Sequence, residues 1–203
     1  MSEDRKVAII TGSSQGLGAS IAIKLSQRNI NLVINYSNNK DMALKIKDEC
    51  VNNGVEAITV QADVSSDDDC KKLVQETINT FGKVDILVNN AGTTKFADHS
   101  KLDKLNDEDF INIYKVNVIG PYQMIRADEP IMKENGFGSV VNISSIAGKT
   151  GIGSSIAYAA SKGALNTMTL SLAKALGPEI RVNTVCPGFI GTCLLYTSPS
   201  PRD

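Results

Sequence analysis

Short apolar runs rich in valine and isoleucine alternate along the chain with longer stretches of helical period. This alternation is typical of a parallel sheet whose two faces are covered by helices. Each apolar run between turn signals predicts a buried strand. We therefore expect an α/β fold, a doubly wound parallel sheet, with strands at 7–11, 31–36, 57–61, 84–88, 139–143 and 181–185.

The clearest helix is predicted between the third and fourth of these runs. Apolar residues recur there at i, i+3, i+4, i+7, i+8 and i+11, one stripe of a helix; they are Cys70, Leu73, Val74, Thr77, Ile78 and Phe81. Asp67 to Asp69 put negative charge where the helix dipole favours it, and Gly82 is expected to end the helix. Gly54 and Gly177 are expected to end two further helices in the same way.

Residues 104–135 are predicted to form one long helical region whose period breaks near Gly120 and Pro121. The apolar positions of this region exceed one helix face; they are Phe110, Ile113, Tyr114, Val116 and Val118. We expect part of the region to face another subunit.

Composition excludes several classes of protein. The 203 residues are 42% apolar, enough for one globular domain with a full core. A net charge of -1, without long runs of one sign, argues against nucleic acid or a membrane surface as partner. The four cysteines show no C-x-x-C pair, so we expect no metal site and no disulfide framework, and a reducing cytoplasm is the simplest compartment. The apolar run at 7–10 is too short to span a membrane and lacks a signal-peptide layout.

A glycine-rich segment follows the first predicted strand. Residues 11–18 read Thr-Gly-Ser-Ser-Gln-Gly-Leu-Gly and lead directly into a helix predicted over 19–28. Glycines let the backbone turn tightly and approach a pyrophosphate, while the helix dipole and its free amides attract negative charge. No Gly-Lys-Ser/Thr follows, so the segment is not a P-loop.

The Gly-x-x-x-Gly-x-Gly spacing, together with motifs further along, resembles the short-chain dehydrogenase/reductase family over residues 6–192. The matching motifs are Asp63-Val64, Asn89-Asn90-Ala91-Gly92, Asn117, Ser144-Ser145, Tyr158-x-x-x-Lys162 and Pro187-Gly188. Each falls at the carboxyl end of a predicted strand or on a helix facing that end, where ligands bind in open α/β sheets.

The resemblance implies a Rossmann fold and an oxidoreductase that binds a nicotinamide cofactor. The residues implied to bind it are Gly12, Ser14, Gln15, Gly16, Leu17, Gly18, Tyr36, Ser37, Asp63, Val64, Asn90, Ala91, Gly92, Tyr158, Lys162, Pro187, Gly188, Ile190 and Thr192.

The end of the second strand bears on the choice of cofactor. Sites that prefer NAD usually carry Asp or Glu about 20 residues beyond the glycine loop, whereas this strand ends Asn35-Tyr36-Ser37, with Lys40 close by. These neutral side chains can bond a phosphate without charge repulsion, and the ending resembles NADPH-using 3-oxoacyl-(acyl carrier protein) reductases. Many such members carry Arg where this chain has Gln15, so one phosphate partner is missing. We favour NADP(H), with NAD(H) as the alternative.

Tyr158 and Lys162 stand at i and i+4, on one face of a helix. An ammonium near a phenol stabilises the phenolate and lowers its pKa, so the tyrosine can act as acid or base. By resemblance, Tyr158 is the acid/base and Lys162 also bonds the nicotinamide ribose. The family interval of thirteen residues before the tyrosine selects Ser145, rather than Ser144, to polarise the substrate oxygen. Asn117 is implied to hold a water that continues the proton path to Lys162.

These residues predict hydride transfer between NADP(H) and a ketone or secondary alcohol, with a 3-oxoacyl thioester as a candidate substrate. A sugar, steroid or small-alcohol dehydrogenase of the same family is an alternative that the loop at 93–96 does not decide. A non-catalytic nucleotide sensor is less favoured, because such proteins lose the tyrosine or the lysine. The resemblance also implies a homodimer or homotetramer formed through the helices that carry Asn117 and Tyr158.

Residues 193–203 depart from the family pattern. They resemble the in-frame translation of a transposase-based sequencing adapter, and we expect them to be an artefact; a genuine Ser-Pro tail is the alternative. The family continues with a substrate-covering helical segment, a helix and a final strand. We therefore expect a domain over 1–192 that is incomplete at its carboxyl end and lacks the last strand, with an exposed sixth strand, poor solubility and little activity.

Overall fold

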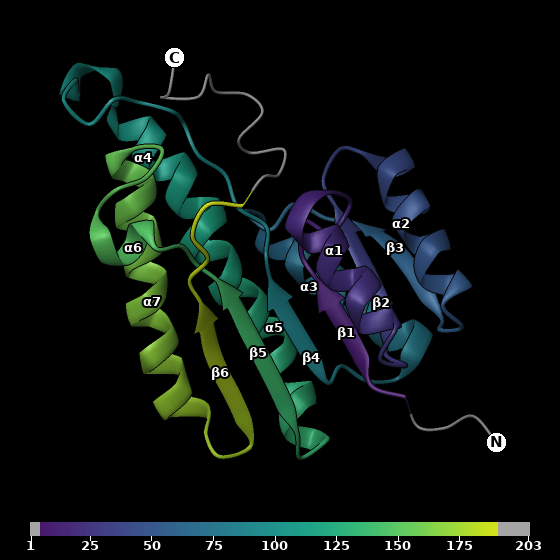
Figure 1. The fold of residues 1–203 in the computed structure, drawn as a ribbon. Coiled ribbons are helices and arrows are strands. Elements are labelled where there is room, and N and C mark those ends of the chain that lie inside the picture. Colours follow the sequence, from purple (N-terminus) through teal and green to yellow (C-terminus); the bar gives the residue numbers. More distant parts are fainter. Residues whose placement is uncertain (1–4, 191–203) are drawn as a thin grey trace.

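The structure, a computed structural model, describes residues 5–190. Its centre is a six-stranded sheet in the order β3-β2-β1-β4-β5-β6, with every neighbouring pair parallel (Figure 1). The strands are β1 (Val7–Ile10), β2 (Asn31–Tyr36), β3 (Ala57–Gln61), β4 (Ile86–Asn89), β5 (Gly138–Ile143) and β6 (Ile180–Val185). The expected doubly wound α/β fold is confirmed. The strand order reverses between β1 and β4, which places a ligand-binding switch point at their carboxyl ends.

Helices follow most strands at the predicted places. They are α1 (Gly16–Ser26), α2 (Lys40–Asn52), α3 (Asp67–Phe81), α4 (Asp107–Tyr114), α5 (Gly120–Glu134), α6 (Ala147–Thr150) and α7 (Ile156–Leu176), with a short 3-10 helix at Leu102–Lys104. The predicted limits of α3 are confirmed, because Ser66 caps it by accepting a hydrogen bond from the N–H of Asp69 and Gly82 ends it at a φ of 74°. α1 begins at Gly16, three residues before the predicted 19, because the last glycines of the loop already belong to its first turn.

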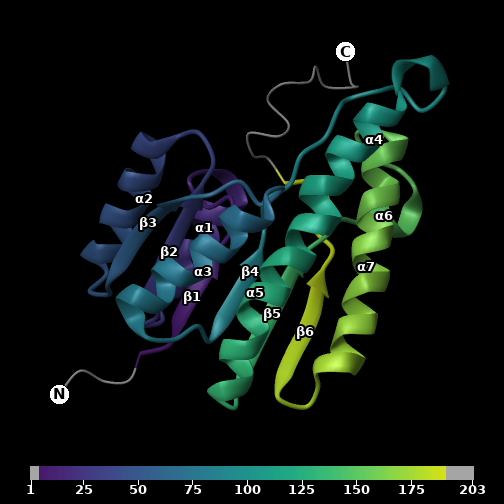
Figure 2. The same ribbon diagram turned by 180° about the vertical axis from the view of Figure 1, so that it is seen from behind.

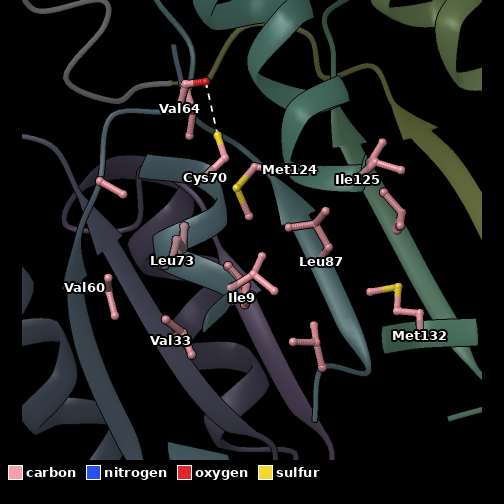
Figure 3. Packing of buried hydrophobic residues seen from close by; sticks show 14 of the residues in the cluster. Ile9, Val33, Val60, Val64, Cys70, Leu73, Leu87, Met124, Ile125 and Met132 are labelled. Carbon is pink, nitrogen blue, oxygen red and sulfur yellow. Dashed lines mark hydrogen bonds between the residues drawn. The ribbon is translucent and has the colours of Figure 1, made fainter. Parts of the chain in front are cut away.

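Each face of the sheet packs against its own helices. On one face, β1, β2 and β4 contribute Ile9, Val33 and Leu87 to a core shared with α3 and α5 (Figures 2 and 3). On the other face, α1 and α2 pack over β1 and β2 through a second cluster that includes Ala22 and Ala43. Strands buried on both faces read as unbroken apolar runs, which is why they could be found from sequence.

The break expected near Gly120 is a π-helical turn, Lys115–Ile119, that joins α4 and α5 without interrupting the helix. Pro121 has no N–H and its ring clashes with the carbonyl four residues earlier, that of Asn117, so regular α-helical bonding cannot continue through this point. The helix widens by one residue per turn instead, and the N–H of Gly120 donates to the carbonyl of Lys115. Turns of this kind are frequent at functional sites, and this one carries Asn117 into the interior, where it is 0% exposed.

Candidate active site

The glycine loop packs backbone against backbone with the loop that follows β4. Gly12 and Gly16 adopt φ values of 62° and 59°, which favour glycine. A Cβ at Gly12 would lie 3.0 Å from Cα of Ala91, and a Cβ at Gly18 only 2.5 Å from Nδ2 of Asn90. No larger residue fits at position 18 without moving its neighbours.

The amino end of α1 is free to bind an anion. Gln15, the N-cap residue, is extended and makes no capping hydrogen bond with its side chain, and the first turn holds no acidic residue. The first N–H groups of a helix have no partner within the helix, and the dipole adds positive charge there. The backbone at Gly16, Leu17 and Gly18 therefore fits the pyrophosphate of a dinucleotide. Ser14, in the same loop, is 8% exposed.

Two side chains fasten this loop to the one after β4. Nδ2 of Asn90 donates to the carbonyls of Thr11 (2.9 Å) and Gly12 (3.1 Å). In return, the hydroxyl of Thr11 accepts from the N–H groups of Asn90 and Ala91, at 3.0 Å each. Sequence reasoning identified Asn90 but missed Thr11, whose only signal was its place between the first strand and the first glycine.

Asn35 does not have the role expected from the sequence. It is 2% exposed, its Oδ1 accepts from the N–H of Gly12 at 2.9 Å, and its Nδ2 donates to the carbonyls of Ala62 (3.0 Å) and Val60 (3.3 Å). The expectation that this amide bonds a phosphate is therefore wrong, because the side chain turns inward and supports the glycine loop from below.

Other side chains remain accessible at the ends of β2 and β3. Ser37 and Lys40 are exposed, whereas Tyr36 is 6% exposed and packs in the core beneath α1 and α2. Asp63 is exposed, and its Oδ1 accepts from the N–H (2.9 Å) and the hydroxyl (2.8 Å) of Ser65. Val64 lies under the π-helical turn, since a Cβ at Gly120 would be 2.9 Å from its carbonyl oxygen. A phosphate near Ser37 would meet a hydroxyl and an ammonium.

Tyr158 lies near the start of α7, within reach of Ser145, which follows β5. Burial raises the pKa of the Tyr158 phenol, and the Ser145 hydroxyl lowers it by less. The neighbouring Ser144 is 4% exposed and donates instead to the carbonyl of Lys162 at 3.1 Å. Of the adjacent serines, Ser145 is the one that meets the tyrosine.

Lys162 lies 4% exposed beneath the tyrosine. Its Nζ donates to the carbonyl of Ile143 at 2.9 Å and lies 5.6 Å from the centre of the Tyr158 ring. Burial lowers the pKa of the ammonium to about 8. The net shift of the Tyr158 pKa is upward, because burial of the phenol outweighs the effect of Ser145. The expectation that Lys162 lowers this pKa stays a prediction. A phenol with a raised pKa is protonated at neutral pH, the form that an acid needs.

Asn117 ties the π-helical turn to two neighbours. Its Oδ1 accepts from the N–H of Thr93 at 2.8 Å, and its Nδ2 donates to the carbonyl of Thr93 and the hydroxyl of Ser161, both at 3.0 Å. A Cβ at Gly92 would lie 3.5 Å from Oδ1 of Asn117 and 3.6 Å from Nζ of Lys162, so both atoms border the same small space. One lone pair of Oδ1 is left to accept a further bond there. Sequence reasoning named Thr93 only as part of the loop at 93–96 and did not name Ser161.

The loop after β6 joins the site through the main chain. The N–H of Ile146 donates to the carbonyl of Pro187 at 2.9 Å, and Gly188 and Ile190 follow, exposed and half-buried. Thr192 and the segment 193–203 lie outside the described residues. The described positions from the glycine loop, the loop after β4, Asn117, Ser145, Tyr158 and Lys162 are thus linked by contacts, while Ser37 and Asp63 lie beyond them along the sheet.

Large apolar side chains are exposed on the loops that adjoin Tyr158 and Ser145. Hydrogen bonds hold the loop after β4 against the loop before α7, from the N–H of Ala97 to the carbonyl of Ser154 (2.9 Å) and between the hydroxyls of Thr94 and Ser154 (2.6 Å). A Cβ at Gly153 would be 3.4 Å from the Tyr158 ring. Four large apolar side chains are exposed on these loops and on those after β5 and β6, beside polar ones such as Lys95 and Lys149; they are Phe96, Ile146, Ile152 and Phe189.

Comparison with known proteins agrees with this geometry. The family model for short chain dehydrogenase matches residues 6–202. A protein of Streptomyces violaceoruber assigned as ketoacyl reductase 2 of the granaticin polyketide synthase is 40% identical over 186 residues, which are 92% of this chain and 73% of that protein. The 3-oxoacyl-(acyl-carrier-protein) reductase of Staphylococcus epidermidis is 35% identical over 91% of this chain and 75% of its own length.

Solved structures show the same fold. A crystal structure from Burkholderia xenovorans, assigned as a short-chain dehydrogenase/reductase, matches with a TM-score of 0.90 and 42% identity over 93% of this chain and 78% of that one. An NAD+-bound xylitol dehydrogenase matches with a TM-score of 0.86 and 30% identity over 92% of this chain and 71% of that one.

The chain belongs to the short-chain dehydrogenase family and is an oxidoreductase of that family, which uses NAD(H) or NADP(H). Within residues 5–190, no helix is long and apolar enough to cross a membrane.

Proposed function

We propose that the protein reduces the carbonyl group of an acyl substrate, a 3-oxoacyl thioester in the first instance, with NADPH. The observation that carries this proposal is the placement of the Tyr158 phenol and the Ser145 hydroxyl within reach of each other beside the buried ammonium of Lys162. A protonated phenol next to a second hydroxyl can bind one carbonyl oxygen from two sides.

The cofactor, when bound, supplies the hydride that adds to the carbonyl carbon. The chain's own residues handle the oxygen. Ser145 and Tyr158 donate hydrogen bonds to it, and the Tyr158 hydroxyl releases its proton to the oxygen as negative charge develops, leaving a phenolate. Lys162, 5.6 Å from the ring centre, stabilises that phenolate while its ammonium is charged. The phenolate then regains a proton from the Lys162 ammonium, and solvent reprotonates Lys162 through a water that Asn117 would hold in the space beside Gly92, which polar atoms of both residues border.

The preference for NADPH rests on the side-chain charges between the end of β2 and the start of α2. Ser37 and Lys40 are among the exposed side chains there, and both can bond a 2′-phosphate, the lysine as a cation. The strand ends in Asn35, Tyr36 and Ser37 without the carboxylate that would hold both ribose hydroxyls of NAD.

The acyl substrate is supported by the apolar side chains on the loops that adjoin Tyr158, of which Ile152 and Phe189 are 77% and 85% exposed. Covering such side chains with a hydrocarbon chain would remove apolar surface from water. Two relatives are named as reductases of ketoacyl or 3-oxoacyl compounds. A dehydrogenase of small alcohols or sugars is the second candidate, because the xylitol dehydrogenase shares the fold at 30% identity.

We further propose a homodimer or homotetramer formed through α4, α5 and α7. Four large apolar side chains are exposed on these helices and the turn between them: Ile111 (51%), Ile119 (45%), Tyr122 (45%) and Leu170 (66%). Light scattering that gives only monomer would contradict this assembly.

The test of function is a substrate screen that follows NADPH absorbance. The purified protein, produced at the full length of its relatives, is offered acetoacetyl thioesters, sugars, polyols and steroid ketones, each with NADPH or NADH. We expect the highest kcat/KM with an acetoacetyl thioester and NADPH. Preferential oxidation of a polyol would support the second candidate, and a clear advantage of NADH would contradict the proposed cofactor.

A further inference from the structure

Ser161 lies one residue before Lys162 on α7 and is 0% exposed. Its hydroxyl donates to the carbonyl of Tyr158 at 2.7 Å and accepts from Nδ2 of Asn117 at 3.0 Å. One small side chain therefore joins the helix of the acid/base tyrosine to the π-helical turn. These are separate elements of the chain, packed together at this point.

The direction of these bonds fixes the orientation of the Asn117 amide. A serine hydroxyl has one hydrogen, and here it goes to the Tyr158 carbonyl, so Ser161 can only accept from Asn117. The N–H of Thr93, on the other side of the amide, can only donate, and it meets Oδ1 at 2.8 Å. A flipped amide would set its oxygen against the lone pairs of Ser161 and of the Thr93 carbonyl, and its N–H against the N–H of Thr93.

This orientation matters for the space beside Gly92. When Oδ1 of Asn117 points toward Thr93, this oxygen and Nζ of Lys162 lie beside the same space next to Gly92. Alanine at position 161 would remove the acceptor from one buried N–H of Asn117 and leave it unpaired. The amide would then be held by Thr93 alone, without the contact that fixes it from the side of α7.

We propose that Ser161 is a positioning residue for the reaction. It holds the Asn117 carboxamide with its oxygen toward the proton path beside Lys162, and does so without contact with the reacting atoms. This inference rests on the proposed function for its effect on turnover, while the hydrogen bond itself can be tested without any substrate.

The kinetic test compares Ser161→Ala, Asn117→Ala and the double variant with the unsubstituted chain. We expect Ser161→Ala to lower kcat at least about 10-fold, within the roughly 100-fold that a small misplacement of a catalytic group can cost, with KM nearly unchanged. In the Asn117→Ala background the same substitution should change kcat less than about 2-fold, because residues that act as one unit are not additive.

Ser171→Ala is the matched control. Ser171 is exposed on the same helix, and its hydroxyl bonds the carbonyl of Thr167 at 3.3 Å, a similar local contact away from the site. We expect it to leave kcat unchanged. Equal, additive losses from Ser161→Ala in both backgrounds would show a role independent of Asn117 and would overturn the proposal, as would full activity of Ser161→Ala.

A second readout needs no activity. With asparagine labelled by 15N, the side-chain amide signal of Asn117 is assigned by its loss in Asn117→Ala. We expect Ser161→Ala to shift this signal and to speed exchange of its protons with water. An unchanged signal would overturn the proposed hydrogen bond. If the unsubstituted chain reduces no carbonyl compound, the proposed function fails, and the amide signal still decides whether Ser161 orients Asn117.

Discussion

A carboxyl group buried in the core should make the stability of this protein depend on pH. Asp128 is 0% exposed on α5, and within the described part of the chain neither carboxyl oxygen has a hydrogen-bond partner. Asp128 lies four residues after Met124 and four residues before Met132, so the three side chains share one face of the helix. Both methionines belong to the core against the sheet. Burial raises the pKa of this carboxyl well above its ordinary value. Asp128 is therefore protonated in the folded protein over a pH range where the unfolded chain ionises it.

The sign and size of the effect follow from this difference. Because the folded pKa is raised, the stability associated with Asp128 is fully present below the unfolded pKa of about 3.9 and is lost as pH rises toward the folded value. Within that window the loss is about 1.4 kcal/mol per pH unit. Asp128→Asn keeps the shape of the side chain and does not titrate, so its stability relative to the parent should rise by that amount with each pH unit.

The assay is urea unfolding followed by circular dichroism at pH 5, 6 and 7, for the parent and for Asp128→Asn. Asp68→Asn is the matched control, since the Asp68 side chain on α3 is 97% exposed and its substitution should leave the pH dependence as in the parent. The same free-energy difference between parent and Asp128→Asn at all three pH values would contradict a raised pKa for Asp128.

Three further results are expected. Gly18→Ala should lower Tm by about 2–12 °C, because the added Cβ meets Asn90 at 2.5 Å and overpacking costs about 1–3 kcal/mol; Gly163→Ala, with only one contact at 3.5 Å inside a helix, should not lower it. Reduction should slow as pH rises through about 8, where Lys162 loses its proton. In Lys162→Arg any remaining activity should lose that alkaline limb, since arginine stays charged, and an unmoved limb in the pH profile of kcat would contradict this. Ser37→Asp should raise KM for NADPH about 10-fold, a repulsion of about 1.4 kcal/mol, and an unchanged KM would place the phosphate elsewhere.

Local signals made the sheet and the helix ends predictable. Strands buried on both faces appear in the sequence as continuous apolar runs. The cap of α3 at Ser66 and its end at Gly82 depend only on neighbouring residues. The π-helical turn was visible only as a break in period. A pattern of apolar positions shows that the repeat fails near Pro121, and it does not say whether the helix stops or widens.

The site was predictable in its motifs and less so in its orientations. Tyr158 and Lys162 share a helix face by their spacing alone. The inward turn of Asn35 depends on Val60 and Ala62, which a second strand brings beside it, and sequence spacing carries no such information. The raised pKa of Tyr158 likewise comes from the burial of the ring by other segments. Ser161 went unnoticed because a serine inside a helix usually has no role beyond the helix itself.

The most direct test of the account is the turnover of Tyr158→Phe with NADPH and an acetoacetyl thioester. This substitution keeps the ring and removes the proton donor, so kcat should fall at least about 100-fold, the lower range for acid–base catalysis. Tyr122→Phe, on the exposed side of α5, should retain the parent rate. Near-normal turnover of Tyr158→Phe would contradict the assignment of Tyr158 as the proton donor.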